Sequence, residues 1–114
     1  MRMWMINPKL LCRKHLLGAH GELHKFRHNF EKKHSIKGRT HPVVQIEPAS
    51  MQLRHDELVV EMLSRGYNHN SPYVMPDISY LGSDAYVKVD RELSIKDLKE
   101  RCPDCKKLID KMLL

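Results

Sequence analysis

The sequence is poor in aromatic residues, long apolar runs and cysteine. Aromatic side chains make up 6% of its 114 residues, which argues against a sugar-binding surface or an aromatic-rich β-sandwich. No stretch approaches the roughly 20 apolar residues of a membrane-spanning helix, and the apolar start, residues 1–6, is too short for a signal peptide. Three cysteines are an odd number, so we expect a cytoplasmic protein rather than a secreted one held by disulfides.

Acidic residues are scarce in the first 46 positions. This part has ten basic and two acidic side chains, a formal charge of +8, whereas the remainder has ten basic and twelve acidic side chains, a charge of −2. Six of the eight histidines also lie in the first part. A basic excess confined to one part of a short chain is typical of nucleic-acid-binding proteins. The alternative is a cationic face that serves only solubility.

The length, with 41% hydrophobic residues, predicts one compact domain over residues 1–114. The first helix is expected to start with Asn7 as its N-cap and Pro8 in its first turn, and to run to about His34. A second helix is expected over residues 50–65, with Gly66 as its stop signal.

The third helix is expected to start at Ser94, which forms a Ser-x-x-Asp start signal with Asp97. Pro103 breaks or restarts this helix. The connections, residues 35–49 and 67–93, are rich in turn-forming residues and leave room only for short extended pieces. The predicted fold class is therefore all-α, a single compact domain of about three helices.

Helical geometry sorts the first predicted helix into faces. The stripe expected to be buried consists of Cys12, Leu16, Ala19, Leu23 and Phe26. The opposite arc, expected to face solvent, consists of Arg13, His20, His24 and Arg27. His15 and Glu22 lie on the border two turns apart, with Gly18 between them leaving a notch. Glu22 is either a functional carboxylate or an ion-pair partner of Lys14 or Lys25.

Two blocks of sequence follow one another with a specific spacing. The first is KHLLGAHGEL over residues 14–23, followed by KH at 33–34 and GR at 38–39. The second is ELVVEMLSRGYN over residues 57–68, followed by DIS at 77–79. With these blocks and a weaker match over residues 94–103, most of the chain resembles the phage endonuclease V family, the pyrimidine dimer DNA glycosylases.

The resemblance implies a DNA repair glycosylase with abasic-site lyase activity, on a three-helix fold whose N-terminal segment packs at the active site. In that family the α-amine of the N-terminal residue attacks the sugar C1′ and displaces the base. A Schiff base forms, and β-elimination cuts the strand without a metal or other cofactor. The implied partner is double-stranded DNA carrying a damaged pyrimidine or an abasic site. The resemblance also implies that the protein is a monomer with no membrane contact. It is expected to act in the cytoplasm of a bacterial or phage-infected host cell.

An ungapped alignment assigns the catalytic positions that the resemblance implies. It places Met1 at the nucleophile, Arg2 at a phosphate-binding arginine, His15 at the active-site histidine and Glu22 at the catalytic glutamate. Methionine is expected to stay in place because the following Arg2 is large. An α-amine has a pKa of about 7.7–8.0, so a useful fraction is neutral and nucleophilic. A carboxylate beside it can stabilise a cationic sugar and move protons. The predicted DNA-binding residues are Arg2, Lys25, Lys32, Lys33, Lys37 and Arg39.

The sequence departs from the family pattern at several positions. Gly21 and Lys25 stand where the family has arginines, Ala19 stands where an acidic residue is expected, and no aromatic residue follows Tyr86. Lysine binds phosphate as a point charge rather than as a fork. The excised base is therefore left open between a pyrimidine dimer and another damaged or modified base, and an abasic site is a further possible substrate.

Cys102 and Cys105 admit three interpretations. They are core thiols, or zinc ligands together with Cys12 and His15, or a redox pair. The core interpretation is favoured because both thiols continue an apolar stripe at helical spacing.

The series His20, His24 and His28 allows a metal-dependent nuclease, but a solvated, DNA-facing edge is favoured since no carboxylate accompanies it. A non-catalytic DNA-binding module is the other alternative. Trp4 is predicted to anchor the N-terminal segment in the core rather than to stack on a base.

Overall fold

A computed structural model describes residues 2–113, which form helices and loops without any strand. The predicted all-α class is confirmed. The helices, in chain order, are η1 (Pro8–Leu10), α1 (Arg13–Glu31), α2 (Lys37–Thr40), η2 (Pro48–Ser50), α3 (Met51–Ser64), η3 (Ser79–Tyr86), α4 (Arg91–Arg101) and α5 (Pro103–Leu113), where η denotes a 3-10 helix. None of these helices combines the length and apolar character that crossing a membrane requires.

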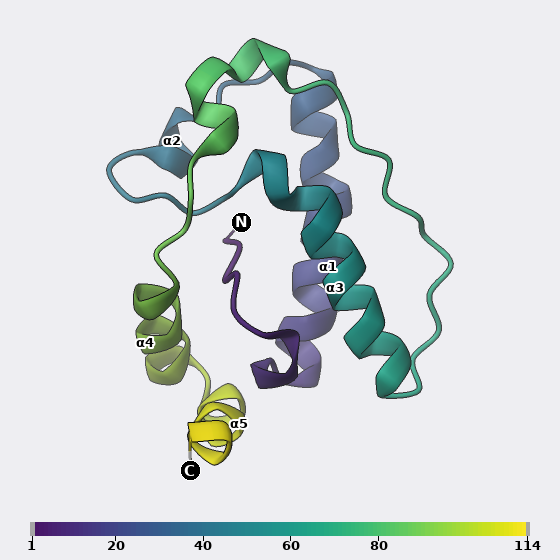
Figure 1. Ribbon diagram of the computed structural model, residues 1–114, viewed down its shortest axis with the longest axis vertical. Coiled ribbons are helices and arrows are strands. Elements are labelled where there is room, and N and C mark those ends of the chain that lie inside the picture. Colours follow the sequence, from purple (N-terminus) through teal and green to yellow (C-terminus); the bar gives the residue numbers. More distant parts are fainter. Residues whose placement is uncertain (1, 114) are drawn as a thin grey trace.

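Helices α1 and α3 lie side by side and antiparallel (Figure 1). Leu16, Leu23 and Phe30 recur every seven residues on α1 and are buried, as are Leu58 and Met62 on α3. This spacing gives each helix one apolar stripe, and burying the two stripes against the rest of the core is the main stabilising interaction.

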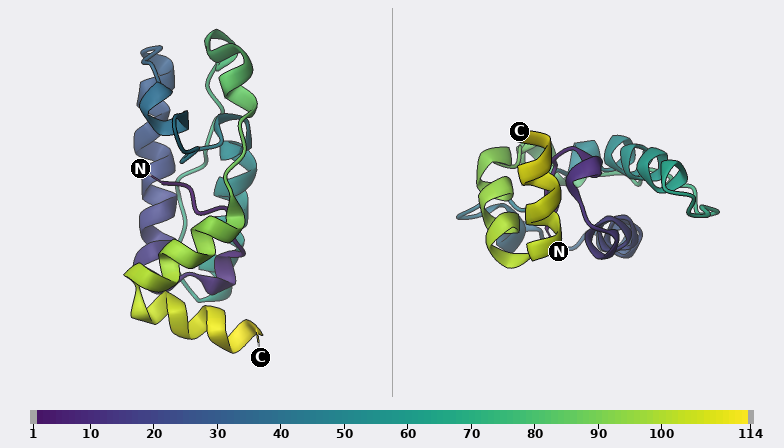
Figure 2. Two further views of the ribbon diagram at one scale, coloured as in Figure 1. Left: turned by 90° about the vertical axis from the view of Figure 1, so that its left-hand side faces the viewer. Right: turned by 90° about the horizontal axis from the view of Figure 1, so that it is seen from below.

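The N-terminal segment, residues 2–7, lies between the α1–α3 pair and the hairpin formed by α4 and α5 (Figures 1 and 2). Met3, Trp4, Met5 and Ile6 are all buried. The backbone N–H of Met3 donates to the Gln45 carbonyl at 2.7 Å. Residues 3–6 are therefore part of the core, and Trp4 is the core anchor that the sequence predicted.

Arg54 of α3 and Arg65, which directly follows α3, bind backbone carbonyls of this segment and of the η1 turn after it. Arg54 donates from Nη1 to the Ile6 carbonyl at 2.7 Å. Arg65 donates from Nη2 to the carbonyls of Pro8, at 3.2 Å, and Leu11, at 2.7 Å. Glu61 keeps Arg65 in place through a 2.7 Å ion pair. Because charged donors form stronger hydrogen bonds than neutral ones, these contacts fix the path of the segment.

The predicted first helix is interrupted at Leu11 and Cys12. Asn7 does cap a helix, accepting from the Lys9 N–H at 3.0 Å, but that helix is the short η1. The α-helix begins after Cys12 and continues through Gly18 and Gly21 to Glu31. A continuous helix from Asn7 to His34 is therefore wrong in its first part. Asn7 is an N-cap as predicted, but the Leu11 carbonyl accepts a hydrogen bond from Arg65 instead of from an N–H of a following helical turn.

The C-terminal part forms two helices where one interrupted helix was predicted. Helix α4 begins at Arg91, capped by the Asp90 carboxylate, which accepts from the Leu93 N–H at 3.1 Å. Ser94, the predicted start, is buried inside this helix. Pro103 restarts the helix as predicted and begins α5.

The second predicted helix is α3, and it ends as expected. Gly66 follows its last turn with a φ of 83°, a left-handed conformation that glycine adopts without strain. The extended segment after it returns along α3 to η3 (Figure 1). The short helices α2 and η3 were not predicted, because both lie in segments dominated by turn-forming residues.

Replacing Arg65 by alanine is predicted to lower the free energy of unfolding by about 2 kcal/mol, because two partly buried carbonyls lose a charged donor. Urea denaturation followed by circular dichroism measures this change. The control is Arg101→Ala, which removes an exposed arginine of α4 and should change the value by less than about 0.5 kcal/mol. If both variants changed the free energy of unfolding by the same small amount, the role given to Arg65 would be contradicted.

Candidate active site

A hollow of about 260 Å³ lies where the N-terminal segment meets one face of α1. Its walls are formed by Arg2, Trp4, Lys14, His15, Gly18, Ala19 and Glu22. Three of the predicted site residues, Arg2, His15 and Glu22, are thus brought together. Met1, the predicted nucleophile, lies outside the described residues.

One wall of the hollow is a stack of three side chains. The Arg2 guanidinium carbon lies 4.6 Å from the centre of the Trp4 ring. Trp4 in turn meets the His15 ring edge to face, with ring centres 6.2 Å apart. Helix α4 holds the outer member, since Asp97 Oδ2 lies 2.8 Å from Arg2 Nη2. Arg2 is therefore oriented on two sides, and Asp97 partly balances its charge.

His15 is a neutral imidazole at this wall. Burial lowers its pKa, the positive charge of Lys14 lowers it further, and the carboxylate of Glu22 partly opposes both effects. The lowered pKa favours the neutral imidazole, whose Nδ1 lies 3.2 Å from Cys12 Sγ.

Glu22 is the exposed acid of the hollow. Within residues 2–113, no hydrogen bond or ion pair engages its carboxylate, so the alternative that it pairs with Lys14 or Lys25 is not realised. Gly18 lies one turn earlier on the same border, and no atom stands within 4 Å of where its Cβ would be. The predicted notch between His15 and Glu22 is thus open space, and a group entering it meets a free carboxylate.

The other predicted DNA-binding residues do not line the hollow. All five have exposed side chains. Lys25 lies one turn beyond Glu22 on α1. Lys32 and Lys33 follow at the end of that helix, and Lys37 and Arg39 belong to α2.

Four histidines meet between α1 and α3. His20 and His24 of α1 are half-buried, and their rings lie 4.8 and 5.0 Å, centre to centre, from that of the buried His55. His69 from the extended segment completes the cluster. The prediction of a solvated edge is therefore wrong for His20 and His24, because this arc of α1 packs against α3. It is right for His28, which is exposed.

One hydrogen bond joins two members of the histidine cluster, and a backbone carbonyl contacts one of them. Nε2 of His20 lies 3.1 Å from Nε2 of His55, and the latter is also 3.0 Å from the Ser71 carbonyl oxygen. Burial, and then the charges of the other rings, lower the pKa of His20 to about 4 and also lower that of His24. The four ring nitrogens could hold a metal ion, but the Ser71 carbonyl competes as a partner for His55.

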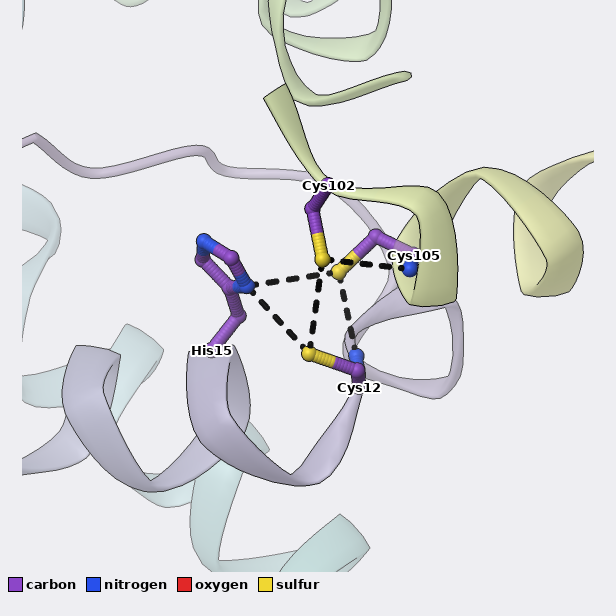
Figure 3. A group of neighbouring side chains, drawn as sticks. All are labelled: Cys12, His15, Cys102 and Cys105. Carbon is purple, nitrogen blue, oxygen red and sulfur yellow. Dashed lines mark hydrogen bonds between the residues drawn. The ribbon is translucent and has the colours of Figure 1, made fainter. Parts of the chain in front are cut away.

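A second cluster joins α1 to the C-terminal hairpin. Cys12, His15, Cys102 and Cys105 place their sulfur and nitrogen atoms within 4.8 Å of one another (Figure 3). His15 belongs both to this cluster and to the wall of the hollow. Cys102 and Cys105, at the junction of α4 and α5, thus reach the site from a part of the chain that lies about 90 residues away in sequence.

Comparison with known sequences decides the family. A family model described as pyrimidine dimer DNA glycosylase matches residues 1–75 of the 114. The chain belongs to the pyrimidine dimer DNA glycosylase family. Comparisons with curated proteins and with solved structures found no significant match.

The pyrimidine dimer DNA glycosylase match contains all the residues that line the hollow and all four members of the histidine cluster. The family assignment makes the chain a DNA repair glycosylase with DNA as its substrate. The match ends before α4 and α5, so Asp97, Cys102 and Cys105 lie outside it. Sequence reasoning gave no sign that Asp97 would touch Arg2 or that His55 would meet His20, because no local pattern links residues so far apart.

The neutral histidine cluster of this glycosylase predicts a loss of stability in acid. His20 has a folded-state pKa of about 4 against an ordinary value of 6.5. The unfolded chain therefore binds more protons between these values, and stability falls as the pH is lowered through that range. Denaturation at about pH 7.5 and about pH 5 measures the effect, which His20→Gln should reduce.

His28→Gln is the matched control, because His28 lies on the same helix but is exposed and outside the cluster. The His28→Gln variant should lose as much stability between the two pH values as wild type does. An identical loss in wild type and in His20→Gln would show that the cluster does not carry the acid sensitivity.

Proposed function

We propose that this glycosylase is also an abasic-site lyase that uses the α-amine of Met1 as its nucleophile. The observation that carries the proposal is the hollow, in which Arg2 lines the same space as His15 and Glu22. Met1 is one residue from Arg2, a Cα step of about 3.8 Å. The family resemblance assigns the same positions to a nucleophile, an active-site histidine and a catalytic glutamate.

The chemistry follows from the properties of an amine. The neutral α-amine attacks the sugar C1′ of a damaged pyrimidine nucleotide, such as one in a pyrimidine dimer. The C1′–N bond breaks and the base leaves with the electron pair. Loss of a proton from nitrogen and opening of the sugar ring give a protonated Schiff base. Removal of a C2′ proton then expels the 3′ phosphate by β-elimination, which cuts the strand.

Glu22 and His15 are the groups placed to assist these steps. A free carboxylate beside the sugar stabilises positive charge that develops at C1′ and can carry protons during imine formation and elimination. His15 can form a hydrogen bond with the substrate or with water on the opposite side of the Gly18 notch.

DNA binding is assigned to the exposed cations. Lys25 lies beside the hollow on α1, and the other four exposed residues extend this positive surface along the end of α1 and onto α2. Such contacts fix the position of the duplex without reading its sequence. Arg2, already held by Asp97 and Trp4, is pre-oriented to meet a phosphate at the hollow. We propose that the whole chain acts as one domain and as a monomer on double-stranded DNA.

The proposal predicts a covalent adduct. Incubating the full chain with duplex DNA that contains an abasic site, and reducing with borohydride, should join protein and DNA, because reduction fixes a Schiff base. Undamaged duplex of the same sequence should give no adduct. Failure to form an adduct with abasic-site DNA that the protein demonstrably binds would contradict the proposal.

Glu22→Gln is predicted to lower the rate of strand cleavage at least about 100-fold while DNA binding is retained or strengthened, because the variant removes a carboxylate from a cationic surface. Single-turnover cleavage and salt-dependent binding measure the two effects. Glu31→Gln is the matched control, since it removes the other acid of α1, which pairs with Arg27 away from the hollow. Equal cleavage rates in the two variants would contradict the role of Glu22.

A further inference from the structure

Three cysteines that the amine chemistry does not use surround Nδ1 of His15 (Figure 3). Cys12 directly precedes α1, and His15 lies in the first turn of that helix. Cys102 directly precedes α5, and Cys105 lies in its first turn. The two pairs therefore have the same placement, and both helix starts converge on one point.

Three of the distances within this cluster are close to those in a tetrahedral zinc site. With Zn–S bonds of about 2.3 Å and a Zn–N bond of about 2.0 Å, a tetrahedron requires about 3.8 Å between sulfurs and about 3.5 Å between sulfur and nitrogen. Cys12 Sγ and Cys102 Sγ are 3.8 Å apart. His15 Nδ1 lies 3.2 Å from Cys12 Sγ and 3.5 Å from Cys105 Sγ. We propose that one structural Zn²⁺ ion is bound by Cys12, His15, Cys102 and Cys105.

Backbone N–H groups point at two of the sulfurs. The Cys12 N–H points to Cys105 Sγ at 3.2 Å, and the Cys105 N–H points to Cys102 Sγ at 3.4 Å. Backbone donors of this kind stabilise the negative charge of a metal-bound thiolate. The positive ends of the α1 and α5 dipoles also favour thiolates, and three thiolates with Zn²⁺ leave a net charge of −1.

Zinc accounts for the cluster better than the alternatives. A disulfide between Cys12 and Cys102 would need their sulfurs at about 2.05 Å instead of the observed 3.8 Å, and would leave Cys105 and the His15 nitrogen unused. Ordinary core thiols would not gather around an imidazole nitrogen. The histidine cluster offers nitrogen ligands only and has a competing carbonyl, whereas three thiolates and one imidazole are a common zinc ligand set.

The site would tie the C-terminal hairpin to the hollow. Metal binding at His15 Nδ1 leaves Nε2, which points away from the sulfurs in Figure 3, to carry the ring proton and act as a hydrogen-bond donor. The ion would thereby fix both the orientation and the tautomer of His15 at the wall of the hollow. It takes no step in the amine chemistry, and the proposal stands without that chemistry.

Metal analysis of the purified full chain tests the site. The protein is loaded with zinc under reducing conditions and dialysed against a weak chelator. Wild type should retain one equivalent of zinc. Cys102→Ser and Cys12→Ser should each lose it, because the affinity of each variant for zinc should be at least about tenfold lower. The control is the double variant His20→Gln, His24→Gln, which should retain that equivalent. Full retention in the cysteine variants, or no zinc in wild type, would overturn the proposal.

Cobalt substitution of the wild type keeps the test independent of variants that fail to fold. Co²⁺ in the proposed site should give the intense absorption of a tetrahedral complex together with sulfur-to-cobalt charge transfer that reports three thiolates. A weak octahedral spectrum, or charge transfer from fewer than three thiolates, would refute the assignment. Abasic-site trapping by the zinc-depleted protein is scored separately, so the zinc site and the amine nucleophile can each fail without the other.

Discussion

The burial of the N-terminal segment is the constraint on which the site depends. A chain terminus is ordinarily mobile, because few contacts offset the entropy lost on ordering it. Here Met3 to Ile6 lie in the core, and α3 binds the backbone on either side of η1 through Arg54 and Arg65. These contacts place Arg2 and Trp4 against α1. The proposed nucleophile, the Met1 amine, requires this anchoring because it directly precedes Arg2.

The C-terminal hairpin, formed by α4 and α5, contacts two residues of the same site. Asp97 of α4 holds Arg2, and the two cysteines at the start of α5 meet His15. Both contacts come from residues beyond the part of the chain that matches the glycosylase family. The family-matched part thus supplies the groups that line the hollow, while the remainder fixes the orientation of two of them. This division explains how a small helical protein can hold several side chains rigidly around an open notch.

Local signals in the sequence predicted the helices, and long-range contacts explain where those predictions failed. The apolar spacing of Leu16 and Leu23, the stop at Gly66 and the restart at Pro103 require only neighbours along the chain. The break before α1 depends on Arg65, 54 residues after Leu11. His20 was expected in solvent because its arc of α1 is polar, yet its partner His55 lies 35 residues away. Among the site residues, the border position of His15 and Glu22 followed from helical spacing, whereas their proximity to Arg2 rested on the resemblance.

The central claim is that the chain's own α-amine is the nucleophile, and the hollow offers one competing amine, the ε-amine of Lys14. Peptide mapping by mass spectrometry of the borohydride-reduced adduct distinguishes the two directly. An α-amine is neutral far more often than a lysine at physiological pH. We expect the sugar on the nitrogen of Met1, and an unchanged adduct yield in Lys14→Arg. A sugar attached to Lys14, with its yield abolished in that variant, would contradict the account.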